Sequence, residues 1–127
     1  TGYVTARAAR PLVAGQWYHL AGVYDGQRVM LFVDGKLAAL TAGSGEVRKH
    51  YLPLVIGADV NGDGSAVDPV DGTVDAVRIS SVARYNPTRD FKPAPRALVD
   101  ENTRLALNLD FEVGGIVYDE SQSNSHP

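Results

Sequence analysis

Two Asp-Gly pairs are the feature that most constrains how this chain can fold. The first, at residues 25–26, separates the run Gln16–Tyr24 from Gln27–Val33, and the second, at residues 34–35, separates that run from Lys36–Leu40. All three runs are rich in aliphatic, β-branched or aromatic residues, and an Asp-Gly pair between two such runs supplies the positive φ angles of a tight hairpin turn. The sequence therefore predicts a meander of three antiparallel strands over residues 16–40.

Short strand-like runs interrupted by turn residues continue along the rest of the chain. Gly occurs 13 times and Pro 7 times, and no run has the period of a long amphipathic helix. We expect further strands at Leu54–Gly57, Thr73–Ser80 and Leu105–Phe111, with a weaker one at Gly2–Ala8. Pro87, Pro93 and Pro95 predict an extended connection across the surface between Arg84 and Glu101. The fold class is thus all-β.

Length, charge and composition exclude several kinds of partner. A chain of 127 residues fits one domain, and its 44% hydrophobic and 21% charged residues are typical of a globular one. A net charge of −3 without a cationic stripe argues against nucleic acid. No apolar run approaches the roughly 20 residues that cross a bilayer, so membrane insertion is not expected. The absence of an initiator Met and of a signal core identifies the chain as an excised piece.

Several motifs, taken in order, resemble one family. Trp17–Gly26 and Leu31–Gly35 resemble the Trp-x-His strand, hairpin and Val-Asp-Gly turn of laminin-G-like domains. Leu54–Gly57 and Asp71–Ser80 continue the likeness, and the latter is similar to the family's Gly-x-Ile-Asp-Glu-Val-Arg-Ile strand. The resemblance covers roughly residues 16 to 111, and an ordered series of motifs is more specific than any one of them.

This resemblance implies an antiparallel two-sheet β-sandwich of the concanavalin-A-like jelly-roll type. The sandwich is expected over residues 1–111 with its first strands absent, because family members have several strands ahead of the Trp-x-His segment. Residues 112–127 are expected to form a polar C-terminal tail that frays, or the start of a following segment. The stretch Leu105–Gly114 resembles the strand that opens such domains, and it either starts a second repeat or closes this one.

Acidic residues suggest one structural calcium ion. By β alternation Asp75 shares a face with Val77 and Ile79, so it turns inward if that face is the core. The resemblance implies that this Asp is a calcium ligand completed by backbone carbonyls and water; the alternative is that it accepts backbone N–H bonds. The loop from Asp59 to Gly64 is either a long turn or a non-helical calcium loop using Asp63. Our hypothesis is one Ca²⁺ among Asp59, Asp63 and Asp75.

Catalysis by this chain is not expected. Glycoside hydrolysis needs two carboxyl groups about 5 to 10 Å apart across a cleft. The acids of Asp110-Phe111-Glu112 lie at the ends of a tripeptide that does not match the alternating acids of glucanase relatives, and Asp119 and Glu120 are adjacent. No Gly-x-Ser-x-Gly elbow is present either.

Aromatic side chains are the candidate ligand-binding residues, because flat rings stack on sugar faces. Tyr51 and Tyr85 lie beside turns or loops and are the preferred candidates, whereas Trp17 lies in an apolar run and is assigned to the core.

By analogy with the family, the expected function is a non-catalytic binding or adhesion module in a larger extracellular or cell-surface protein. Its expected partners are a carbohydrate or glycoprotein ligand and the neighbouring domains of the parent protein. One alternative is a structural spacer or protein-interaction domain of a surface or virion tail protein, and another is a fragment of a glycoside hydrolase.

Overall fold

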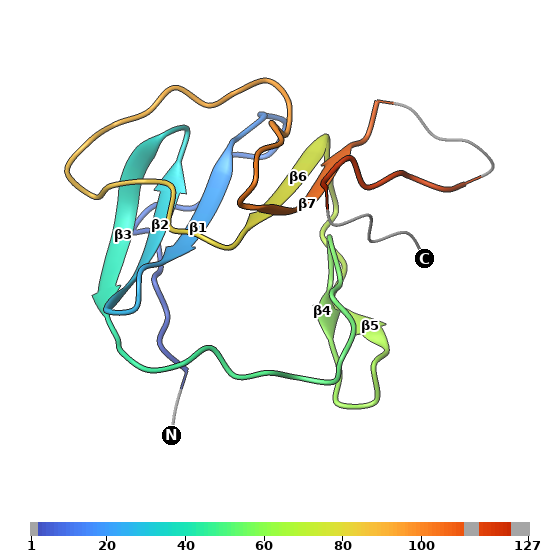
Figure 1. The fold of residues 1–127 in the computed structure, drawn as a ribbon, viewed down its shortest axis with the longest axis horizontal. Helices are drawn as coiled ribbons and strands as arrows, with labels where there is room; N and C mark the ends of the chain where they lie inside the picture. The colour runs from blue at the N-terminus through green and yellow to red at the C-terminus, as the bar shows by residue number, and fades with distance from the viewer. Residues whose placement is uncertain (1–2, 111–114, 123–127) are drawn as a thin grey trace.

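The computed structural model describes residues 3–110 and 115–122, and in these ranges the chain is built from antiparallel strands without a helix (Figure 1). The strands form three sheets: β1-β2-β3, β4-β5 and β6-β7. The predicted all-β antiparallel class is confirmed. Within the described ranges there is also no helix long and apolar enough to cross a membrane.

The three-stranded meander predicted from the Asp-Gly pairs is confirmed. It consists of β1 (Leu20–Tyr24), β2 (Arg28–Val33) and β3 (Lys36–Ala42). Asp34 and Gly35 both have positive φ, 50° and 79°, as a type I′ turn between Val33 and Lys36 requires. In the first turn only Gly26 has positive φ, at 92°, which is the pattern of a type II′ turn.

The core lies on one face of this meander. Met30 and Phe32 alternate along β2 onto the same face and are 1% and 0% exposed. The connection that follows β6 crosses this face, as its prolines predicted, and places Tyr85 and Phe91 against the two buried side chains. The Phe91 N–H donates a 3.0 Å hydrogen bond to the Gly35 carbonyl, which ties the connection to the second hairpin turn.

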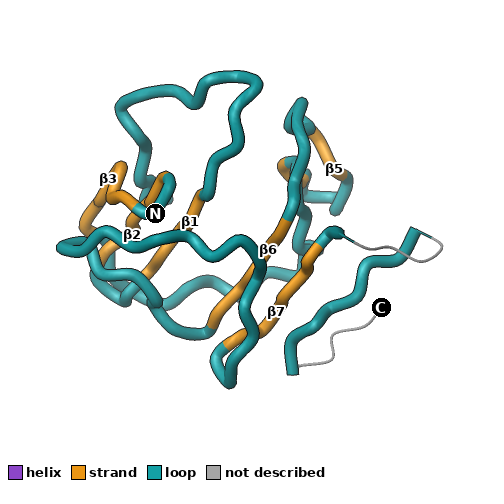
Figure 2. Tube along the Cα trace, turned by 90° about the horizontal axis from the view of Figure 1, so that it is seen from above, coloured by secondary structure: helices purple, strands orange, loops and turns teal. Residues whose placement is uncertain are grey.

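A two-stranded sheet, β6 (Ala76–Ser80) with β7 (Thr103–Asn108), lies beyond β1 (Figures 1 and 2). These strands fall within the predicted runs 73–80 and 105–111 but are shorter or shifted, and Phe111 lies outside the described residues. Because β7 pairs with β6, the stretch that resembles an opening strand closes this sheet in the present chain.

Residues 119–121 dock on β7. Asp119 is 6% exposed and its Oδ1 accepts a 2.9 Å hydrogen bond from the Ala106 N–H, and the Glu120 N–H donates to the Ala106 carbonyl at 2.8 Å. Ser121 is 3% exposed and donates to the Arg104 carbonyl. The expectation of a frayed tail is therefore wrong for these three residues, because their polar side chains satisfy the backbone of β7. Residues 123–127 lie outside the described residues.

Two predicted strands are absent from the described residues. Leu54–Gly57 is not a strand; instead β4 (Asp59–Val60) pairs with β5 (Ala66–Val67) around a local turn. The Asn61 N–H donates to the Ser65 carbonyl and the Asp63 carboxylate accepts from the Ser65 N–H, so side-chain and turn hydrogen bonds place this hairpin after the apolar run. Residues 3–8 of the weaker candidate are also not in a strand.

Candidate functional site

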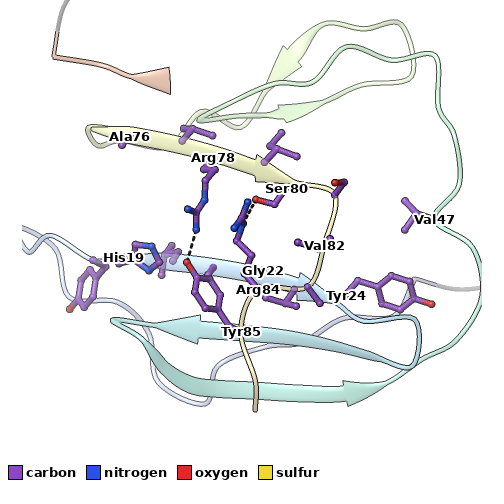
Figure 3. A pocket seen from close by; sticks show the side chains of 18 residues that line it. His19, Gly22, Tyr24, Val47, Ala76, Arg78, Ser80, Val82, Arg84 and Tyr85 are labelled. Carbon is purple, nitrogen blue, oxygen red and sulfur yellow. Dashed lines mark hydrogen bonds between the residues drawn. The ribbon is translucent and has the colours of Figure 1, made fainter. Parts of the chain in front are cut away.

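A cleft of about 690 Å³ separates the meander from the β6–β7 sheet. Residues 18–24, which include β1, form one wall, and residues 76–85, which include β6, form the other (Figure 3). Val47 lines one end. Since β1 is the outer strand of its sheet and β6 is the outer strand of another, the cleft lies between two sheet edges.

An aromatic cluster of His19, Phe32, Tyr85 and Phe91 joins the two walls. Tyr85 stacks on Phe91 with ring centroids 3.6 Å apart, and both rings tilt against Phe32, at 5.8 and 5.7 Å. The edge of His19 meets Phe91 at 5.6 Å. Aromatic pairs contribute about 0.5–1.5 kcal/mol beyond the area they bury, so the cluster holds the connection after β6 firmly on the meander.

Two cationic or titratable groups face the cleft beside this cluster. Arg78 donates to the Tyr85 hydroxyl at 2.9 Å and to the Leu98 carbonyl at 3.4 Å, and within the described ranges no carboxylate oxygen lies within 4.0 Å of it. Burial lowers the pKa of His19, as does the charge of Arg78, whereas Asp34 opposes the change. The His19 imidazole is therefore neutral at pH 7, and its buried Nδ1 has no hydrogen-bond partner among the described residues.

Arg84 braces the far end of the β6 wall. Its guanidinium forms two hydrogen bonds to the Asp100 carboxylate, at 2.6 and 2.7 Å, and its Nε donates to Ser80 Oγ at 2.5 Å. The paired hydrogen bonds to Asp100 raise the pKa of Arg84 and hold the pKa of Asp100 well below its usual range. Both groups are therefore charged at neutral pH, and they fix the start of the long connection.

The residues that line the cleft include no Asp and no Glu. Glycoside hydrolysis uses a pair of carboxyl groups on either side of the scissile bond. The charges that this cleft offers are those of Arg78 and Arg84, and one of them is already paired. The described lining is therefore suited to binding rather than to acid–base chemistry on a sugar.

Comparison with known families decides the wider assignment. Residues 1–87, more than half of the chain, match the family model Laminin_G_3, described as the concanavalin A-like lectin/glucanases superfamily. The chain belongs to this superfamily. Neither a curated protein nor a solved structure matches it. The resemblance found in the sequence motifs is thus confirmed for the lectin/glucanase superfamily, and β7 lies beyond the matched residues although it pairs with β6.

The predicted ligand-binding aromatics of this lectin/glucanase-type domain lie in different places. Tyr85 lines the cleft, but its ring is half-buried in the aromatic cluster and its hydroxyl accepts from Arg78. Tyr51 lies on the loop between β3 and β4, is 85% exposed and stacks on His50. The assignment of Trp17 to the core is wrong: the side chain is 68% exposed, because β1 begins only at Leu20.

The three predicted calcium ligands do not come together as a set. Among the described residues no three His, Asp or Glu side chains are placed to share an ion. Asp63 accepts hydrogen bonds from Ser65 within its own turn, which lowers the Asp63 pKa, and Asp59 accepts from the Val60 N–H. The inward orientation of Asp75 is wrong: the residue is exposed just before β6, and its carbonyl accepts from the Leu109 N–H. A calcium site completed by carbonyls and water stays a prediction.

Sequence reasoning missed Arg78 and gave His19 a structural role only. The signal for Arg78 was its position, because a charged residue between Val77 and Ile79 interrupts an otherwise apolar strand and needs a specific environment. That environment is formed by Tyr85 and Leu98, which are 7 and 20 residues away in sequence. Local pattern alone does not indicate such neighbours.

Proposed function

We propose that this chain is a non-catalytic binding module of a larger secreted or surface protein and that it recognises carbohydrate. The superfamily description includes lectins as well as glucanases. The cleft lining without carboxylates supports the lectin side of that pair. Hydrolysis by a fragment of a glycosidase would need acids from elsewhere.

The observation that carries the proposal is an exposed aromatic platform formed by Tyr51 and His50. The two rings stack with centroids 4.8 Å apart and an interplanar angle of 24°, and Tyr51 is 85% exposed. His50 Nδ1 accepts a 3.1 Å hydrogen bond from the Leu52 N–H, which holds its ring in place. A held, flat and exposed ring pair suits the C–H-rich face of a pyranose, and the Tyr51 hydroxyl and neighbouring Lys49 supply polar groups for sugar hydroxyls.

An array of immobilised glycans tests this function. The wild-type chain is expected to bind at least one glycan class, and Tyr51→Ala is expected to weaken that binding at least tenfold, because stacking is lost. Tyr51→Trp keeps a flat ring and should retain binding. Tyr3→Ala is the matched control, since Tyr3 is also fully exposed but has no stacking partner among the described residues. Silence across the array, or equal binding by Tyr51→Ala, would show that the proposal is wrong.

A further inference from the structure

Every second residue of β1 presents unpaired backbone groups to the cleft. At the start of β1 the Asp34 N–H donates to the His19 carbonyl at 2.8 Å. At its end the Asp25 N–H donates to the Arg28 carbonyl at 3.3 Å. Odd-numbered residues of this segment thus bond to β2, and because backbone groups alternate along an antiparallel strand, the even-numbered ones direct their N–H and C=O away from β2. These are Leu20, Gly22 and Tyr24.

The same analysis applies to β6. The Leu109 N–H donates to the Asp75 carbonyl at 2.9 Å, so Asp75 and then Val77 bond toward β7. Ala76 and Arg78 therefore direct their N–H and C=O away from β7. Both residues line the cleft, as do those of β1. Two rows of unpaired donors and acceptors thus border one cleft.

The separation of the two strands leaves room for another strand. No Cα atom of β1 lies within 8 Å of a Cα atom of β6, whereas paired strands lie about 4.8 Å apart and strands flanking one intervening strand lie about 9.6 Å apart. Figures 1 and 3 show β1 and β6 running in the same direction. A single strand of opposite direction between them would be antiparallel to both.

We infer that this cleft accepts an extended strand of a partner polypeptide, which hydrogen-bonds to β1 on one side and to β6 on the other. The complex would contain one sheet in the order β3-β2-β1-partner-β6-β7. Alternating N–H and C=O groups on a sheet edge match another polypeptide backbone, and strand addition at such an edge is an established mode of peptide recognition. The inference does not depend on glycan binding by Tyr51, so either can fail alone.

Side chains around the cleft define the chemistry of the partner strand. Arg78 has polar neighbours but no carboxylate within 4.0 Å among the described residues, so an acidic side chain on the partner would complete an ion pair. Leu20, Ile79 and Val82 line the cleft and are 54%, 37% and 46% exposed. The partner is therefore an extended segment with apolar residues at alternating positions and one Asp or Glu opposite Arg78.

Selection from displayed peptide libraries tests the inference on the 127-residue chain. One library of nine-residue peptides has random apolar residues at alternating positions and a fixed central Glu, and a second has Lys in its place. We expect binders from the Glu library only. In NMR hydrogen exchange with a synthetic binder, the amides of Leu20, Gly22, Tyr24, Ala76 and Arg78 should be protected. N-methylation of alternate peptide amides should weaken binding about tenfold, with the protein unchanged.

Two protein variants separate edge pairing from other contacts. Gly22→Pro removes an N–H that faces the cleft without breaking the β1–β2 ladder, and a Cβ at this position meets nothing within 4 Å. Ala42→Pro is the control: its partner Arg28 bonds toward β1, so the Ala42 N–H faces away from β2 at the other edge of the meander. Gly22→Pro should weaken peptide binding about tenfold, and Ala42→Pro should leave it unchanged.

Three results would overturn the inference: no binder from either library, equal binding by Gly22→Pro and wild type, or equal recovery from both libraries. Protection of the same amides on raising the protein concentration without peptide would also overturn it, because the occupant would then be a second copy of the chain. Protection by a glycan would assign the cleft to carbohydrate instead.

Discussion

The close approach of Gly35 to the connection after β6 allows a quantitative prediction. Gly35 and Gly26 both occupy hairpin turns with positive φ, 79° and 92°. An alanine costs about 1–2 kcal/mol at either position because of its conformation alone. At Gly26 the added methyl meets nothing within 4 Å, but at Gly35 it would overlap the Phe91 carbonyl oxygen and lie 2.9 Å from the carbonyl carbon. Gly35→Ala therefore requires a backbone shift of the connection.

That shift sets the magnitude. It breaks the Phe91 N–H hydrogen bond to the Gly35 carbonyl, worth about 1 kcal/mol, and loosens the packing of Phe91 in the aromatic cluster, worth about 1–2 kcal/mol. The free energy of unfolding should fall by about 3–5 kcal/mol in Gly35→Ala and by about 1–2 kcal/mol in Gly26→Ala.

Urea unfolding followed by far-ultraviolet circular dichroism measures the difference, since the exposed Trp17 is a poor fluorescence reporter. With a slope of about 1–3 kcal/mol/M, the midpoint of Gly35→Ala should lie about 1 M or more below that of Gly26→Ala. Equal midpoints for the two variants would refute the packing of the connection against the second turn.

Three further outcomes follow from named contacts. Thr103 is 1% exposed and its hydroxyl accepts from the Asp100 N–H at 3.0 Å, so Thr103→Val should lower the free energy of unfolding by about 1–3 kcal/mol in urea titrations; exposed Thr88→Val should change it by no more than about 0.5 kcal/mol. Hydrogen bonds from Arg84 depress the folded pKa of Asp100, so its stabilising effect is complete above the unfolded pKa of about 3.9 and is lost as pH falls through the lower folded pKa. Urea midpoints should therefore fall less steeply below pH 4 in Asp100→Asn than in wild type, and parallel acid limbs would contradict this. If Asp75 helps hold calcium, EDTA should lower the thermal midpoint of wild type but not of Asp75→Asn; an unchanged wild-type midpoint and no bound metal would remove calcium.

The meander could be predicted from sequence because its determinants are local. Each Asp-Gly pair and its flanking β-rich runs lie within a few residues of one another, and the structure places Asp34 and Gly35 at the positive φ angles that the pattern requires. Strand limits were less accurate. β1 begins at Leu20 rather than at Gln16, so Trp17 precedes the strand and is exposed. The composition of a run indicates a strand but does not determine where pairing begins.

The candidate site could be predicted only in part because its residues come from separate segments. Tyr85 was selected as a loop aromatic, but the Phe32 and Phe91 rings that bury it were not foreseeable from its neighbours. Asp75 was expected to turn inward by alternation with Ile79, yet Ile79 itself is 37% exposed. Alternation assigns residues to faces, but only tertiary packing decides which face is covered.

The same contacts that build the core also set the width of the cleft. Tyr85 and Phe91 belong to the connection that leaves β6, and they pack on Phe32 of β2. β6 is therefore held opposite β1 by side chains rather than by strand pairing, with Arg84 and Asp100 fixing the start of the connection. Because this anchoring acts through side chains on one face, the backbone edges of both strands stay unpaired. Core stability and the capacity to receive a strand thus have a common origin in the aromatic cluster.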